Sequence, residues 1–260
     1  MSKTTALRLR GLGKTRRRDA WWATPAVTFF VLSLFVVYAT WAAFQNAHYW
    51  YGSYLSPFYS PELMGDSPHA MFGPKPSAWP WWLPFSPALF ILPIPAFFRF
   101  TCYYYRGAYY KAFWADPPAC AVGEPRKGYT SENGWPLKIQ NGHRYFLIFA
   151  LIFLTFLWKD VWNGFHFDGT WGIGVGSLVL LANTVLLTGY ALSCHSLRHL
   201  LGGRLKFLSR HPVQSACYNC VTGLNKRHML YAWLSLFGVM FADFYVRMLS
   251  MGYWHDWRIV

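Results

Sequence analysis

Long apolar runs separated by shorter polar stretches organise the chain. Five of these runs reach, or come close to, the roughly 20 residues that a helix needs to cross the hydrocarbon layer of a bilayer. They are Ala20–Phe44, Trp81–Tyr105, Tyr145–Trp162, Trp171–Leu201 and Met229–Met251. The pattern predicts an all-α integral membrane bundle of five transmembrane helices. A basic tail at 1–19 precedes a single membrane domain at 20–260.

The composition agrees with a membrane protein. Of 260 residues, 54% are hydrophobic, 21% are aromatic and only 13% are charged, which is too apolar for an ordinary soluble domain of this size. The first apolar run is longer than the core of a signal peptide and continues into a full span. We therefore expect it to be retained as the first transmembrane helix.

The distribution of Lys and Arg predicts the orientation. The tail, the loop 99–144 and the loop 198–227 together hold 20 of the 24 Lys and Arg residues. Because cytoplasmic loops keep positive charge, these regions are predicted to be cytoplasmic, with the N-terminus inside and the protein in the cell membrane. The net charge of +14 flanks membrane spans instead of forming a soluble basic face, so nucleic-acid binding is not expected.

Cysteine and histidine gather on the same predicted side. The predicted topology places all five cysteines there, where thiols are normally kept reduced: Cys102, Cys120, Cys194, Cys217 and Cys220. Five of the nine histidines share that side: His143, His195, His199, His211 and His228. A one-sided pool of thiols and imidazoles indicates a metal centre at the cytoplasmic boundary. For any single member, a small buried hydrophobe or a polar helix-end residue is the competing interpretation.

Spacing narrows the candidates. His195 and His199 are four residues apart, which predicts that they project from one face of the fourth helix toward one metal. Cys217 and Cys220 have the C-x-x-C spacing of a chelating pair and are predicted in a loop. An exposed loop dithiol is the alternative for that pair.

Several strings at the helix ends carry a family resemblance. They are "FRFTCYYYRGAYYKAFW", "DPPACAVGEPRKGYT", "IQNGHRYF", "SCHSLRHLLGG" and "LNKRHMLYAWLSLF". With them the chain resembles the single membrane-anchor (C) subunit of actinobacterial succinate dehydrogenase, respiratory complex II. The resemblance implies that the chain binds a flavoprotein and an iron–sulfur subunit on its cytoplasmic face and passes electrons from succinate to quinone in the lipid membrane.

The resemblance also implies a cofactor. Its actinobacterial class is associated with a Rieske-type [2Fe–2S] cluster, held by two thiolates and two imidazoles. The second helix offers Cys102 and no His, which disfavours a bis-His haem b, although a haem anchor stays an alternative. The predicted ligands are His195, His199, Cys102 and Cys120, with Cys194 and His143 in reserve and Cys217 with Cys220 as the rival thiolate pair.

Quinone reduction needs hydrogen-bond donors near the last redox centre that water can resupply with protons. The string "NKRHMLYAW" at the start of the fifth helix offers such groups. The predicted quinone-binding residues are His228, Arg227, Arg198, Tyr231 and Trp233; most of them are also ordinary residues of a membrane boundary. A zinc-bearing membrane scaffold or transporter is the alternative of a different class.

Within the fifth helix, Asp243 and Arg247 are four residues apart. Intramembrane charges are functional suspects. Here a structural charge pair near the outer surface is the preferred interpretation.

Overall fold

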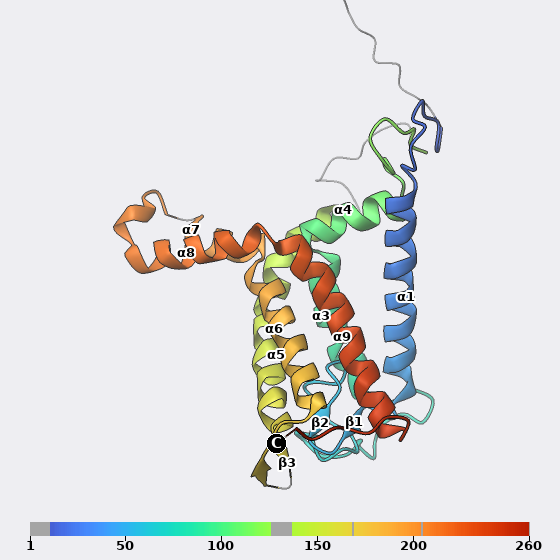
Figure 1. Ribbon diagram of the computed structural model, residues 1–260, viewed down its shortest axis with the longest axis vertical. Helices are drawn as coiled ribbons and strands as arrows, with labels where there is room; N and C mark the ends of the chain where they lie inside the picture. The colour runs from blue at the N-terminus through green and yellow to red at the C-terminus, as the bar shows by residue number, and fades with distance from the viewer. Residues whose placement is uncertain (1–10, 126–136, 168, 204, 260) are drawn as a thin grey trace, which may run out of the picture. The chain divides into compact units, whose positions relative to one another are not determined.

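The computed structural model describes residues 11–125, 137–167, 169–203 and 205–259. Helices dominate the described chain, and two short β-hairpins accompany them (Figure 1). In chain order the elements are α1 (Ala23–Gln45), β1 (Trp50–Tyr51), β2 (Tyr54–Leu55), α2 (Pro87–Ile91), α3 (Pro93–Phe100), α4 (Tyr103–Ala112), η1 (Leu137–Gly142), α5 (His143–Gly164), β3 (His166–Phe167), β4 (Thr170–Trp171), α6 (Val175–Leu192), α7 (His195–Gly202), η2 (Leu208–Arg210), α8 (Pro212–Asn225) and α9 (His228–Ser250).

Four helical segments of the described chain are long and apolar enough to cross a membrane. They are Ala23–Gln45, Lys138–Gly164, Val175–Leu192 and His228–Ser250. The predicted all-α membrane fold is confirmed, and these segments correspond to four of the five predicted runs.

The predicted run Trp81–Tyr105 is not one long helix. Helix begins only at Pro87, and α2 and α3 together end at Phe100, a length of about 21 Å at 1.5 Å per residue. Proline lacks a backbone N–H and is best tolerated in the first turn of a helix, where both α2 and α3 have one. The residues after Phe100 belong to α4, a separate helix.

The predicted run Trp171–Leu201 is also wrong at both ends. Its first residue, Trp171, belongs to β4, and α6 begins only at Val175 and ends at Leu192. The backbone leaves the helical conformation at Ser193 and Cys194 before α7 begins. His195 and His199 therefore lie on the short helix α7 and not on the face of a spanning helix.

Contacts divide the chain into two compact units. The first consists of Met1–Val37 and Arg99–His143, and the second of Tyr38–Phe98 and Arg144–Val260. In the first unit, the described part of the N-terminal tail hydrogen-bonds to the chain near Cys120. Thr15 Oγ1 donates to the Ala121 carbonyl over 2.7 Å, and Arg17 donates to the Cys120 carbonyl over 2.9 Å. Residues 1–10 lie outside the described chain.

In the second unit, α6 packs along α9. Gly189 makes the close approach possible, because a Cβ at this position would lie 2.6 Å from the ring of Tyr231. The buried core near the other end of the two helices contains Leu180, Val246 and Leu249. α6 and α9 are thereby fixed side by side, and the segment that contains α7, η2 and α8 joins them at one end.

At the opposite end of this unit lie both β-hairpins and the C-terminal segment (Figure 1); we call it the strand end. Asp256 holds it together by accepting hydrogen bonds from the hydroxyls of Tyr54 and Tyr245, over 2.8 and 2.9 Å, and from the Gly176 backbone N–H. Burial raises the pKa of Tyr54 above its ordinary value, so its hydroxyl stays protonated and keeps donating.

Candidate functional site

Two buried cysteines each lie at a break between two helices, and the backbone geometry of the two breaks is alike. Cys102 follows α3 and caps α4 with φ −62° and ψ 131°, and Cys194 follows α6 and caps α7 with φ −66° and ψ 138°. In each case the cysteine carbonyl accepts the first hydrogen bond of the next helix, from Arg106 over 2.8 Å and from Arg198 over 3.2 Å. Each cysteine is 2% exposed. The two breaks therefore place a thiol in the interior by the same backbone geometry.

In the first unit, a histidine accompanies the buried cysteine. His143 begins α5, is 6% exposed, and has its Nδ1 atom 3.0 Å from the hydroxyl of Thr101, the residue before Cys102. Arg106 of α4 donates to Gln140 of η1 over 2.8 Å, which fixes the approach to His143. This unit thus supplies one thiol and one hydroxyl-bound imidazole.

The second unit repeats the arrangement. His228 begins α9, and its Nδ1 atom lies 2.7 Å from the hydroxyl of Ser193, the residue before Cys194. The imidazole also stacks on Tyr190, with ring centroids 5.2 Å apart. Asn225 donates to the Ser193 carbonyl over 2.7 Å and so secures the break from the end of α8. Here too a thiol and a hydroxyl-bound imidazole accompany one another.

The other predicted ligands are exposed. His195 and His199 lie on the exposed surface of α7, and Cys120 is exposed in the first unit. Cys217 and Cys220 are exposed as well. Their prediction in a loop is wrong, because Pro212 occupies the favoured first position of a helix and α8 continues through both residues.

The predicted quinone-binding residues separate into two places. Arg227 caps α9 and is exposed, one residue before His228, and the ring of Tyr231 lies against Gly189. Trp233 stacks with Phe237 further along α9. Arg198 instead donates to Thr222 over 3.0 Å and covers the ring of Tyr218, and so holds α7 to α8.

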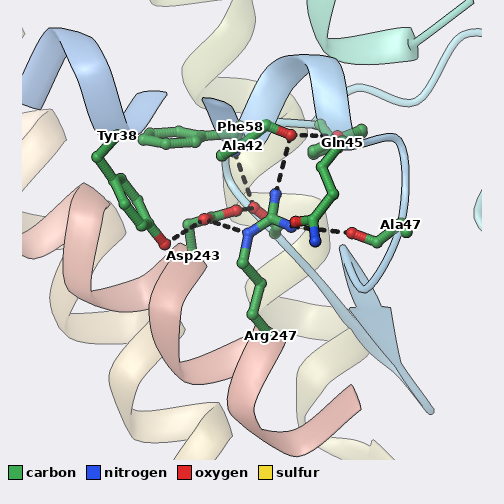
Figure 2. Close-up of polar contacts among 9 residues, drawn as sticks. Tyr38, Ala42, Gln45, Ala47, Phe58, Asp243 and Arg247 are labelled. Carbon is green, nitrogen blue, oxygen red and sulfur yellow. Dashed lines mark hydrogen bonds and ion pairs between the residues drawn. The ribbon is translucent and has the colours of Figure 1, made fainter. Parts of the chain in front are cut away.

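A second polar cluster lies inside the second unit, around the predicted charge pair. Arg247 Nε donates to Asp243 over 2.7 Å, and both side chains are at most 1% exposed. Figure 2 shows the Tyr38 hydroxyl directed at Asp243, to which it donates over 2.7 Å. Ser56 donates to the other carboxylate oxygen. The predicted charge pair is confirmed.

The other two nitrogens of the Arg247 guanidinium also donate hydrogen bonds. It donates to the carbonyls of Ala47 and Ala42, over 2.9 and 3.1 Å, and to the side chain of Gln45 (Figure 2). The ring of Trp41 lies 5.4 Å from the guanidinium carbon. The cluster joins the last part of α1 and the first loop after it to α9, which is a structural task.

Sequence reasoning missed the hydroxyl residues that bond to His143 and His228. Thr101 and Ser193 each stand directly before a buried cysteine, and that shared pattern was the available signal. Among the residues that the structure describes, no three Cys, His, Asp or Glu side chains gather where they would bind a single metal ion.

Comparisons with known proteins identify relatives. Residues 23–252 match the family model described as actinobacterial succinate dehydrogenase subunit SdhC. The chain is also similar to a chain of the solved Mycobacterium smegmatis Sdh1 complex in the apo form. The two share 41% sequence identity over 98% of each chain, with a TM-score of 0.88. No curated protein matches.

Proposed function

Because this chain belongs to the actinobacterial succinate dehydrogenase subunit SdhC family, we propose that it is the membrane anchor through which electrons from succinate reach quinone. The chain is a subunit of the succinate dehydrogenase complex and has no complete activity alone. Its partners are the flavoprotein and iron–sulfur subunits, which dock on the Lys- and Arg-rich cytoplasmic side. The N-terminus lies on that side of the cell membrane.

One observation carries the proposed electron path: a buried cysteine and a hydroxyl-bound histidine occur together twice. Both pairs stand at ends of helices that border the cation-rich loops. Each pair supplies one thiol and one imidazole, the two kinds of ligand that a Rieske-type [2Fe–2S] cluster uses. We assign one thiol–imidazole pair in each unit to iron, Cys102 with His143 and Cys194 with His228, in preference to the exposed Cys120, His195 and His199.

The cluster, when bound, accepts and releases one electron at a raised potential because two imidazoles replace two thiolates at one iron. Hydrogen bonds within the protein orient the proposed histidine ligands. The hydroxyls of Thr101 and Ser193 engage Nδ1 of His143 and His228 and orient each ring, so Nε2 is the nitrogen assigned to iron. Burial of both cysteines keeps water away from the thiolates.

Quinone reduction is assigned to the start of α9. Arg227 is exposed and offers donors supplied from water, and Tyr231 offers a hydroxyl one turn further along the helix. Both lie within a turn of His228, so electrons and protons arrive at the same boundary. Arg198 is engaged with Thr222 and Tyr218, which favours a supporting role for it.

Co-purification tests the proposed partners. The chain, tagged and extracted in mild detergent, is expected to retain a flavoprotein and an iron–sulfur subunit and to reduce quinone with succinate. Iron and acid-labile sulfide are expected beyond the amounts that the soluble subunits carry. A stable preparation of this chain alone that reduces quinone with succinate would contradict the proposal, as would a preparation with zinc in place of iron.

Removal of the Tyr231 hydroxyl tests the quinone site. In the complex, Tyr231→Phe is expected to slow quinone reduction roughly a hundredfold, as loss of one oriented donor commonly does. The paramagnetic signal of the cluster is expected to persist, because the ring and its packing against Gly189 are retained. Tyr253→Phe, the same change at an exposed tyrosine of the strand end, is the matched control. Equal rates for the two variants would remove Tyr231 from the site.

A further inference from the structure

The segment between the two packed spans forms an arm. α7 and α8 pack against one another, with η2 between them, and connect the end of α6 to the start of α9. Both spans are long enough to cross a membrane, so the arm lies at one membrane face. Figure 1 shows it extending sideways from the helix ends. We call residues 195–225 the basic arm and residues 205–213 its tip.

The basic arm is held in a defined shape. Arg198 of α7 donates to Thr222 of α8 over 3.0 Å, and its guanidinium carbon lies 4.7 Å from the ring centre of Tyr218. Gly202 lets the two helices meet, because a Cβ there would lie 2.5 Å from the same ring. The tip is therefore presented by a braced pair of helices.

Charge on and beside the arm is of one sign. Residues 193–228 contain six Lys and Arg and no Asp or Glu. At the tip, Lys206 and Arg210 are both exposed. Such a surface attracts an anionic partner and offers no acidic side chain to weaken that attraction.

The tip also exposes large apolar side chains between its cations. Phe207 is 58% exposed and Val213 is 75% exposed. The Arg210 guanidinium carbon lies 4.8 Å from the centre of the Phe207 ring, so charge and apolar surface are presented together. Lys and Arg on a polar face with aromatic and aliphatic side chains beside them are typical of segments that lie in the headgroup region of a bilayer.

We propose that the tip of the basic arm binds the anionic headgroups of phospholipids in the leaflet beside the spans. Lys206 and Arg210 contact the phosphates, and Phe207 and Val213 enter the boundary between headgroups and acyl chains. The sideways extension of the arm places lipid beside it, and the exposed apolar side chains favour a bilayer over the water-facing surface of a soluble subunit. The arm thereby fixes the anchor's depth on its charged side.

Hydrogen–deuterium exchange of the whole complex tests this proposal. The complex is reconstituted into nanodiscs of phosphatidylcholine alone, or of equal parts phosphatidylcholine and phosphatidylglycerol. Backbone amides of the tip are expected to exchange more slowly in the anionic discs. Each Lys or Arg near an anionic surface contributes about fivefold in binding, so Lys206→Gln with Arg210→Gln is expected to weaken the lipid-dependent protection roughly 25-fold.

Lys75→Gln with Lys159→Gln is the matched control, because it removes the same charge from exposed lysines outside the arm. It is expected to leave the protection of the tip intact. Equal exchange of the tip in the two lipid compositions overturns the proposal. A second result also overturns the proposal: protection of the tip that is the same with and without phosphatidylglycerol and is lost when the soluble subunits are removed from the discs. That result would show that the tip contacts the iron–sulfur subunit. Succinate-dependent quinone reduction, measured in parallel, reports on the proposed function separately.

Discussion

Single replacement of any of the four assigned ligands is expected to abolish the anchor's cluster signal. The variants are Cys102→Ser, Cys194→Ser, His143→Ala and His228→Ala. Loss of a residue that only supports a ligand costs 10- to 100-fold in metal affinity or activity, so loss of a ligand is expected to slow quinone reduction by more than about a hundredfold. Succinate oxidation with a soluble dye should continue, because it needs only the partner subunits.

Electron paramagnetic resonance of the dithionite-reduced complex measures this effect. The Rieske-type signal is expected to vanish in each of the four variants and to survive in the double variant His195→Ala/His199→Ala. The opposite result, loss in the double variant and survival in His143→Ala and His228→Ala, would move the ligands to α7. Size-exclusion profiles of the complexes distinguish a lost cluster from a lost assembly.

The second large effect is expected at the buried charge pair. Asp243→Ala leaves the Arg247 guanidinium buried without its carboxylate, and breaking a buried pair in this way costs about 3–5 kcal/mol. The loss is expected in the free energy of unfolding, measured by denaturant titration of the detergent-solubilised complex. Arg258→Gln, which removes an exposed arginine from the strand end, is the control and is expected to change stability little.

A double variant separates the pair from its surroundings. Asp243→Leu with Arg247→Met replaces both charges by apolar side chains, so no isolated charge is left in the interior. It is expected to be more stable than Asp243→Ala, because the apolar pair avoids the desolvation of an unpaired ion. Equal destabilisation by the two variants would show that the hydrogen bonds to Tyr38 and the Ala42 carbonyl matter more than the ion pair.

Hydropathy predicted the long spans well and the second run poorly. α5 and α9 agree with the predicted runs within two residues, because a bilayer demands uninterrupted apolar helix and leaves a strong signal. In the second run, Pro87 and Pro93 are confined to first turns and so set where α2 and α3 begin. A hydropathy average measures only side-chain polarity, so it does not detect that proline lacks a backbone N–H donor.

The break at Ser193 had no local signal. The string "SCHSLRH" directly after α6 contains no proline or glycine, so a single helix through it was the natural prediction. The break is stabilised by Asn225 and His228, more than 30 residues away, which bond to Ser193. Interactions so distant in sequence are invisible to spacing rules. The Asp243–Arg247 pair was predictable because both residues lie on one helix, whereas its contacts with Tyr38 and Ser56 were not.

The polar cluster of Figure 2 also bears on how the protein is made. During synthesis α9 emerges after every other span, and it carries an aspartate and an arginine, which are costly to place in a membrane when they are unpaired. Their four-residue spacing lets them neutralise one another before any neighbour is reached. In the folded chain, Tyr38 and Gln45 of α1 are bonded to this pair. Because α1 is synthesised first, the polar groups of the first span that bond to the charge pair are made about 200 residues before the pair itself.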